Sequence, residues 1–241
     1  MRVLWCADAR AAAETAAEIV AREVRLRPES VLGLPTGESV LPMYDRLVEL
    51  AAEGIATFAA TTTFNLDEYA GLGPGHPASF RAYMQRQFVG RLRPAPARVH
   101  VPDGDSADLE GACRAYEAAI IEAGGWDLCV LGLGRNGHIG FNEPGSAAHS
   151  RTRVVELAAA TRAAAARDFG PTEAVPERAV TVGVGTILEA RSIVLVAAGT
   201  GKEAALAALL SGHVQRAWPA THLWRHADVT VIADVALRTP A

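Results

Sequence analysis

The sequence predicts a single-domain α/β fold in which a mainly parallel, twisted sheet is flanked by helices on both faces, a Rossmann-like three-layer arrangement. Short apolar runs alternate with longer amphipathic segments along the 241 residues, the pattern produced by repeated strand–helix–strand units. Half of the residues are hydrophobic, which is enough for one sizeable core. We therefore expect one compact domain spanning residues 1–241.

The apolar runs are short and mostly lack polar alternation, so they indicate strands buried on both faces. We expect strands at 3–6, 31–34, 62–66, 99–101, 128–133, 193–197 and 229–232. Helices are expected where apolar residues recur every three to four positions, namely at 12–24, 40–52, 80–89, 108–123 and 202–210. The alanine-rich segment 154–169 also favours helix. Because ligands of such folds bind at the carboxyl ends of the strands, functional residues are expected just after them.

Composition limits the classes of partner. The formal charge is −4 without a run of Lys or Arg, so neither nucleic acid nor an anionic membrane is an expected partner, and a small molecule is. The three cysteines, Cys6, Cys113 and Cys129, have no metal-ligand spacing, so neither a disulfide framework nor a metal site is expected. The apolar run at the N-terminus is too short for a signal peptide. We expect an unprocessed cytoplasmic protein.

Three polar stretches follow predicted strands, and the first is "LPTGESV". Thr36, Gly37 and Ser39 come just before a predicted helix, where backbone N–H groups and two hydroxyls could hold a phosphate. An ordinary helix cap would use the same residues. Glu38 favours the second interpretation, because a carboxylate inside a phosphate loop repels the ligand unless it points away.

The second stretch is "TFNLDEYAGL". Asp67 and Glu68 come at the end of a strand, where α/β enzymes place catalytic carboxylates, so one of them could be a general base. They could equally be solvated turn residues at the start of a glycine-rich loop.

The third stretch, "LGLGRNGHIGFNEPGS", spaces three glycines as in a dinucleotide-binding turn. That turn must open a helix, but Gly140, Pro144 and Gly145 follow too soon for one, so we exclude a nicotinamide site. What remains is a polar loop with Asn136, His138 and Glu143. An imidazole oriented by a carboxylate suits proton transfer near neutral pH, although a lone loop histidine can also be purely structural.

A fourth stretch, "AAGTGKEAAL", places Lys202 at a strand-to-helix turn. The spacing of a nucleotide P-loop is absent. A lysine at this point can bind a sugar phosphate, or it can simply be solvated.

Taken together, these segments resemble the glucosamine-6-phosphate deaminase family, which shares a superfamily with the 6-phosphogluconolactonases. The resemblance covers nearly the whole chain, and its most specific phrases are "NLDEY", "GHIGFNEPG" and "SRTRV". It implies conversion of glucosamine 6-phosphate to fructose 6-phosphate and ammonia, without a metal or organic cofactor. The alternatives are a 6-phosphogluconolactonase-like hydrolase, whose loop usually continues differently after Gly-His, and a non-catalytic sugar-phosphate sensor, which tends to lose the acid and base.

The resemblance also implies roles for individual residues. His138, held by Glu143 and with Asn136 two positions before it, matches the group that opens the sugar ring. Asp67 matches the base that moves a proton between C2 and C1. The phosphate site would comprise Thr36, Gly37, Ser39, Arg167 and Lys202, and residues 151–180 would form a mobile lid.

Two departures from the family pattern stand out. Asn136 replaces an aspartate found in much of the family, which predicts a lower imidazolium pKa for His138. Glu38 stands in a phosphate loop that usually reads T-G-[GS]-T-P, which places the identity of the substrate in question more than the reaction class. The chain also lacks the longer C-terminal region of the allosteric hexameric members. We therefore expect a monomer or small homo-oligomer with weak or no activation by N-acetylglucosamine 6-phosphate.

Overall fold

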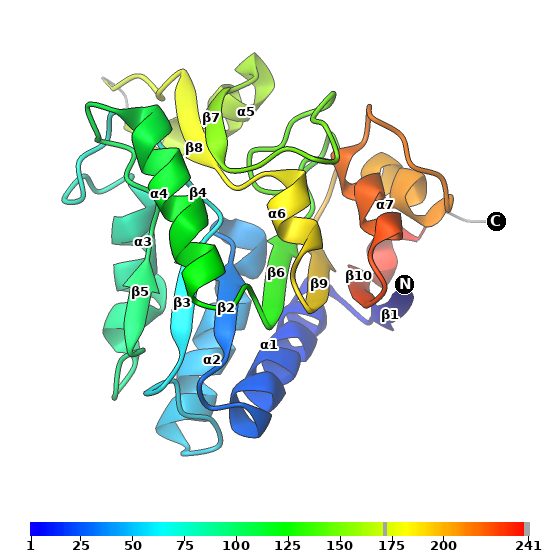
Figure 1. Ribbon diagram of the computed structural model, residues 1–241. Helices are drawn as coiled ribbons and strands as arrows, with labels where there is room; N and C mark the ends of the chain where they lie inside the picture. The colour runs from blue at the N-terminus through cyan, green and yellow to red at the C-terminus, as the bar shows by residue number, and fades with distance from the viewer. Residues whose placement is uncertain (171–172, 239–241) are drawn as a thin grey trace.

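The computed structural model describes residues 1–170 and 173–238. Its main sheet has seven parallel strands in the order β1-β10-β9-β6-β2-β3-β5 (Figure 1). The strands are Arg2–Cys6 (β1), Val31–Leu34 (β2), Thr62–Asn65 (β3), Arg98–His100 (β5), Leu128–Gly132 (β6), Ser192–Ala197 (β9) and Val229–Asp234 (β10). All seven strands predicted from the apolar runs are confirmed, with ends that move by one or two residues.

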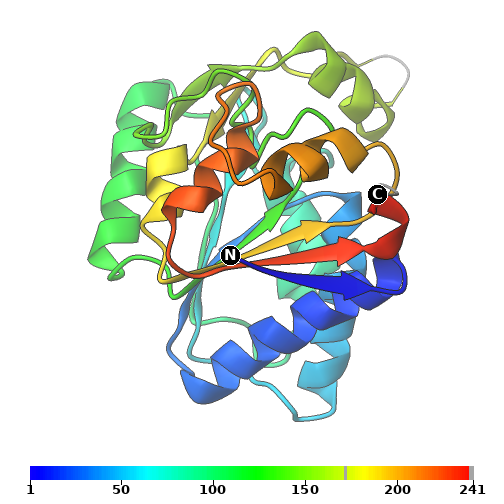
Figure 2. The same ribbon diagram turned by 90° about the vertical axis from the view of Figure 1, so that its right-hand side faces the viewer.

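Helices cover both faces of this sheet, as Figure 2 shows. One face packs against Ala9–Leu26 (α1), Leu41–Ala52 (α2) and Phe80–Gln87 (α3), and the other against Leu109–Glu122 (α4), Val184–Leu188 (α6) and Glu203–Leu210 (α7). Short 3-10 turns complete the chain at Glu38–Val40, Val89–Arg91, Ala166–Asp168, Pro219–Arg225 and Val235–Leu237. Within the described residues, every helix is too short or too polar to cross a bilayer.

Local sequence sets where several helices begin. Asp8, Ser79 and Asp108 precede α1, α3 and α4, and each side chain accepts a hydrogen bond from a backbone N–H three residues on. Such caps satisfy N–H groups that the first helical turn leaves without partners. The helix positions predicted from apolar spacing are confirmed as well. In α1, for example, the apolar residues that recur every three to four positions, such as Ala16, Val20 and Val24, are the buried ones.

A second, three-stranded antiparallel sheet was not predicted. It is formed by Asp67–Tyr69 (β4), Arg178–Thr181 (β8) and Arg153–Glu156 (β7), in the order β4-β8-β7. The alanine-rich segment is helical only at Ala159–Ala165 (α5) and the following 3-10 turn, because its first residues pair in β7. Figure 1 shows β7, β8 and α5 together above one end of the main sheet.

The small sheet has its own apolar cluster. It buries Tyr69, Leu72, Phe141, Leu157, Phe169 and Ala179. Tyr69 contacts Phe169 edge to face at 5.2 Å between ring centroids, and Phe141 at 5.6 Å. This cluster joins β4, the loop after β6 and the segment after β7, so it holds these three parts of the chain over the end of the main sheet.

Glu117 of α4 fixes the segment that leads into β7. Its carboxylate accepts hydrogen bonds from the backbone N–H of Thr152 (3.0 Å) and the hydroxyl of Thr186 (3.0 Å), and it pairs with Arg151 at 2.5 Å. The side chain is only 14% exposed. If the carboxylate were removed, water could not fully replace it as the acceptor for these donors.

We predict that Glu117→Ala lowers the free energy of unfolding by about 2–3 kcal/mol, because buried donors on two segments, at Thr152 and Thr186, lose their acceptor. Denaturant unfolding followed by circular dichroism measures this change. Glu110→Ala on the same helix removes an exposed carboxylate 4.0 Å from Arg114 and should leave the midpoint almost unchanged. Equal midpoints for the two variants would contradict this role for Glu117.

Candidate functional site

The stretches singled out in the sequence meet at one edge of the main sheet. β2, β3, β6 and β9 are parallel neighbours, so the segments that follow them leave from the same edge. The small sheet lies over this edge (Figure 1). The site is therefore built from loops on a rigid sheet and covered by the segment from β7 to β8.

Asp67 and Glu68 lie at the point where the chain leaves the main sheet and enters the small one, and both are buried. The carboxylate of Glu68 accepts backbone hydrogen bonds from Tyr69, Phe80 and Arg81, each at 2.9 Å. It thus anchors the start of α3, a structural task. The interpretation of both residues as solvated turn residues is wrong, and the geometry leaves Asp67 as the carboxylate that is free for chemistry.

Asp67 is held in a poorly solvated place. It is 5% exposed, and burial, together with the neighbouring charge of Glu68, raises its pKa to about 8, while the Phe141 backbone N–H partly offsets the rise. A Cβ on Gly140 would lie 3.3 Å from Asp67 Oδ2, and Gly140 has φ of 54°. Only glycine fits both conditions at little cost, and it brings the loop after β6 directly against the carboxylate.

That loop does not form a dinucleotide site. Between Gly132 at the end of β6 and Arg153 at the start of β7, the chain contains no helix. The prediction that no helix begins after these glycines is therefore confirmed, and this described stretch does not supply the helix N-terminus on which a dinucleotide-binding turn depends. Gly134 instead gives room to a side chain: a Cβ there would lie 2.4 Å from the ring of His138.

The loop carries a chain of hydrogen bonds that ends on His138. Asn136 Nδ2 donates to Glu143 Oε2 at 2.6 Å, and Asn136 Oδ1 lies 2.8 Å from His138 Nδ1. Glu143 itself is 3.9 Å from His138 Nδ1. Glu143 was expected to hold the imidazole, and it lies within ion-pair distance of it, but the amide of Asn136 makes the shorter contact with His138.

These contacts fix the form of the imidazole. A carboxylate only accepts hydrogen bonds, so the NH₂ of Asn136 must face Glu143 and its oxygen must face His138. Nδ1 of His138 then carries the proton, and Nε2 keeps its lone pair. Burial lowers the pKa of His138, Lys202 lowers it further, and Glu143 opposes both. Burial, which the sequence did not indicate, is the largest cause of the lowered pKa, and it favours the neutral ring.

The loop after β2 turns sharply at Gly37 and lies beside the end of β6. Gly37 has φ of 123°, a conformation that glycine adopts easily, and its carbonyl accepts a hydrogen bond from the hydroxyl of Tyr83 at 2.9 Å. A Cβ on Gly132 would lie 3.7 Å from the Ser39 hydroxyl, so this loop and the end of β6 are adjacent. Thr36, Gly37 and Ser39 are all partly accessible.

Glu38 is paired with the segment after β7. Its carboxylate contacts Arg167 Nη2 at 2.8 Å, and the two side chains are 68% and 60% exposed. The structure thus brings Arg167 to the loop after β2, through the residue that departs from the family pattern.

Lys202 and Arg135 add positive charge to the same end of the site. Burial lowers the pKa of Lys202 to about 8, and the charge of Arg135 contributes to this shift. A Cβ on Gly201 would lie 3.2 Å from Arg135 Nε. The charge of Lys202 also lowers the pKa of His138, so Lys202 lies near the loop after β6.

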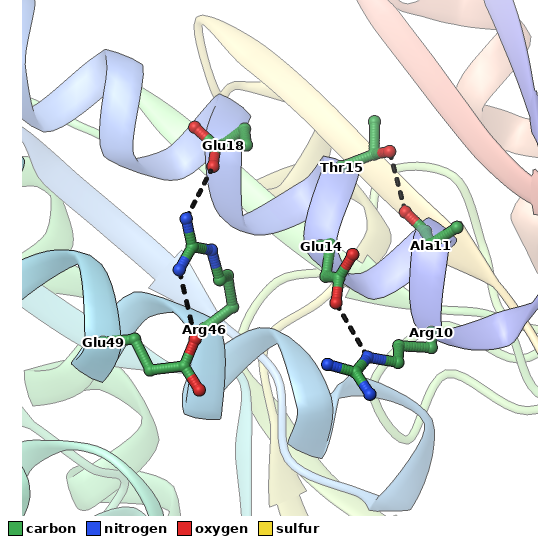
Figure 3. Close-up of a pocket in the computed structure, with 7 residues that line it drawn as sticks. All are labelled: Arg10, Ala11, Glu14, Thr15, Glu18, Arg46 and Glu49. Carbon is green, nitrogen blue, oxygen red and sulfur yellow. Dashed lines mark hydrogen bonds and ion pairs between the residues drawn. The ribbon is translucent and has the colours of Figure 1, made fainter.

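An open depression lies outside this group of residues. It has a volume of about 450 Å³ and lies between α1 and α2. Figure 3 shows that its charged side chains are paired: Arg10 with Glu14, and Arg46 with Glu18 and Glu49. These groups neutralise one another on the surface, and none of the residues singled out after β2, β3, β6 or β9 lines the depression, so it is no candidate for the site.

Sequence reasoning missed three residues beside the site. Thr161 of α5 donates a short hydrogen bond from its hydroxyl to Glu143 Oε1. Trp218 covers the loop, since a Cβ on Gly137 would lie 2.8 Å from its ring. Arg135 lies beside Gly201, as described above. Arg135 stands inside the quoted motif and could have been noticed, but no local pattern links 161 or 218 to residues near 140. In the described part of the chain, no cluster of three His, Cys, Asp or Glu side chains is arranged to hold a metal ion.

Comparison with known proteins gives the family. The family described as glucosamine-6-phosphate isomerases/6-phosphogluconolactonase matches residues 7–232. The chain is 48% identical to a glucosamine-6-phosphate deaminase of Rhodopirellula baltica (95% of this chain, 91% of the relative). It is 44% identical to a protein of the same name from Halothermothrix orenii (97% of each chain).

Solved structures agree with this. A monomeric glucosamine-6-phosphate deaminase of the NagB superfamily matches with a TM-score of 0.95 and 41% identity, over 99% of this chain and 100% of the other. The 6-phosphogluconolactonase of Trypanosoma brucei matches with a TM-score of 0.77 at 17% identity, over 98% and 97%, which shows a shared fold alone. The chain belongs to the glucosamine-6-phosphate isomerase/6-phosphogluconolactonase family.

Proposed function

We propose that this protein is a glucosamine-6-phosphate deaminase, which converts glucosamine 6-phosphate and water to fructose 6-phosphate and ammonia. The observation that carries the proposal is the placement of a buried carboxylate, Asp67, against the loop that carries the neutral imidazole of His138. An aldose–ketose isomerisation needs both a group that opens the ring and a base that moves a carbon-bound proton. The proteins named glucosamine-6-phosphate deaminase that match over more than nine-tenths of the chain support the same choice.

Ring opening falls to His138. Its Nε2 takes the proton from the anomeric hydroxyl and returns it to the ring oxygen as the bond between C1 and that oxygen breaks. Between these two steps the imidazole is positively charged, and Glu143 stabilises this charge through Asn136. A neutral resting ring suits this role, because a permanently charged imidazolium could not accept the first proton.

Isomerisation falls to Asp67. The ionised carboxylate removes the proton from C2 of the open-chain sugar while the substrate's ammonium group gives a proton to O1, which forms an enolamine. The protonated carboxyl group then returns its proton to C1. The resulting imine at C2 reacts with water and releases ammonia. A poorly solvated carboxylate is a stronger base than one in water, and the ammonium group of the arriving substrate favours its ionised form by adding a nearby positive charge.

The phosphate group is assigned to the other end of the site. Thr36, Gly37 and Ser39 offer backbone and hydroxyl donors, and Arg167 and Lys202 offer positive charge. Fixed cations on a remote dianion help to position the reacting end of the sugar. Residues 151–180 are assigned the role of a lid, since they carry Arg167 and lie over the strand ends (Figure 1).

The deciding experiment is an assay of ammonia and fructose 6-phosphate from glucosamine 6-phosphate in the presence of a chelator. Galactosamine 6-phosphate and 6-phosphogluconolactone are assayed in parallel. Equal release of both products from the gluco substrate supports the proposal. Release from the galacto epimer alone would change the substrate, and hydrolysis of the lactone alone would favour the related hydrolase.

We predict that Asp67→Asn lowers kcat by at least about a thousandfold, because an amide cannot act as the base, while KM changes little. Steady-state kinetics with both products measured tests this. Asn is close in size to Asp, so the variant should stay folded, and a thermal melt provides the control. Turnover near that of the unchanged protein would remove Asp67 from the mechanism.

We predict a bell-shaped pH profile of kcat/KM with its maximum near pH 8. Asp67, with a pKa raised to about 8, must lose its proton, so activity rises through that pH. Lys202, with a pKa lowered to about 8, must keep its proton to attract the phosphate, so activity falls above it. Lys202→Arg keeps the charge at high pH and should move only the alkaline limb upward. An alkaline limb that stays in place would exclude Lys202 as its cause.

We predict that Arg167→Ala raises KM by about ten- to a hundredfold, as expected for the loss of a charge-assisted contact to phosphate, and changes kcat less. Measuring both constants separates the two effects. Arg162→Ala, in the same segment, removes a guanidinium that pairs instead with Glu177 at 3.3 Å and serves as the matched control. A similar rise in KM for both variants would contradict a specific role for Arg167.

A further inference from the structure

One contact joins the predicted lid to the proton-transfer end of the site. The hydroxyl of Thr161, in α5, donates a hydrogen bond to Oε1 of Glu143. The other oxygen of Glu143 accepts from Asn136, and Asn136 contacts His138. The hydrogen-bonded chain therefore runs from Thr161 through Glu143 and Asn136 to His138, and Thr161 is the member that comes from the segment after β7.

The direction of the Thr161 hydroxyl is informative. A threonine inside a helix commonly donates to the carbonyl four residues earlier, as Thr15 of α1 does to Ala11 at 2.8 Å. Thr161 instead donates outward, across to the loop after β6. Its hydroxyl thus joins α5 to the loop after β6 and makes no hydrogen bond of this kind within its own helix.

Apart from Thr161, helix α5 is held mainly from its two ends, where the flanking Leu157 and Phe169 are buried in the apolar cluster of the small sheet. None of its residues is buried, and its N-cap residue, Ala158, makes no side-chain capping bond. Arg167, in the 3-10 turn that follows α5, reaches the phosphate loop through its ion pair with Glu38. Contacts at Thr161 and Arg167 therefore tie the same short segment to the two ends of the site.

We propose that Thr161 is a positioning residue that completes the proton relay only when α5 lies over the site. Glu143 is largely buried, with a side chain 15% exposed, so each of its oxygens needs a donor. Asn136 supplies one from the loop itself, and Thr161 supplies the other from the segment that carries Arg167. With Thr161 in place, Glu143 is held in the orientation that orders Asn136 and hence His138. The proposal rests on the deaminase function proposed above.

The proposal predicts a loss in turnover rather than in binding. Thr161→Val keeps the shape of the side chain and removes the hydroxyl, so kcat should fall by about ten- to a hundredfold, the effect expected for one lost hydrogen bond to a charged group. KM should stay within about twofold, since the residues assigned to the phosphate are untouched. Thr161→Ser restores the donor and should recover most of kcat.

The experiment compares the unchanged protein, Thr161→Val, Thr161→Ser and a control, Glu110→Gln. The control removes an 87% exposed charge from α4, outside residues 151–180, where its carboxylate lies 4.0 Å from Arg114, and should leave both constants unchanged. Ammonia and fructose 6-phosphate release gives kcat and KM, and a thermal melt verifies folding. No release by the unchanged protein would refute the deaminase function itself.

Given an active protein, three results would overturn the inference. The first is a kcat for Thr161→Val equal to that of the unchanged protein. The second is a raised KM with unchanged kcat, which would mean that Thr161 only helps to hold the phosphate end. The third is a Thr161→Ser variant as slow as Thr161→Val, which would show that the hydroxyl is not the active feature.

Discussion

The burial of the Asp67 carboxylate is the constraint on which the rest of the site depends. The residue lies where the chain passes from β3 of the main sheet to β4 of the small one, so its surroundings come from both sheets. Solvent is excluded on one side by the loop at Gly140 and on the other by the sheet itself. Burial raises its pKa to about 8, which makes it a useful base near neutral pH but costs stability whenever it is ionised. The site can hold such a group only because the neighbouring segments are fixed independently of it.

Glu68 provides part of that support. Two adjacent buried carboxylates would repel each other if both lacked partners, yet Glu68 accepts three backbone N–H groups and thereby closes the start of α3. One acid is thus stabilised by donors and serves the fold, while its neighbour lacks such a set of donors and is left reactive. The same division recurs in the loop after β6. There Asn136 and Glu143 are hydrogen-bonded to each other and hold one nitrogen of His138, while the other nitrogen is left for chemistry.

Most of the main sheet and the positions of the polar loops could be predicted from the sequence, because apolar runs and glycine-rich turns are local signals. The small sheet could not, since β4 is three residues long and begins with two carboxylates, so it lacks the apolar alternation of a strand. The partners within the site were also out of reach. Spacing placed Asn136, His138 and Glu143 in one loop but could not show that the amide lies between the other two. Likewise, Glu38 was expected to disturb a phosphate loop, whereas it binds Arg167, 129 positions further along the chain, through a contact that only the fold creates.

The segment after β7 contacts Glu143 through Thr161 and Glu38 through Arg167. These two contacts can couple recognition of the substrate to proton transfer. Thr161 and Arg167 are six positions apart. At a helical rise of about 1.5 Å per residue, they are separated by roughly 9 Å along the helix axis. A hexose phosphate has its reacting carbon and its phosphate at opposite ends, so a rigid segment can engage both ends only when the ligand is long enough and carries the anion. A sugar without phosphate would leave Arg167 paired with Glu38, and would contribute nothing to holding the segment in place. Selection for the phosphorylated sugar would then act on the rate of proton transfer as well as on binding, because the same piece of backbone carries both contacts.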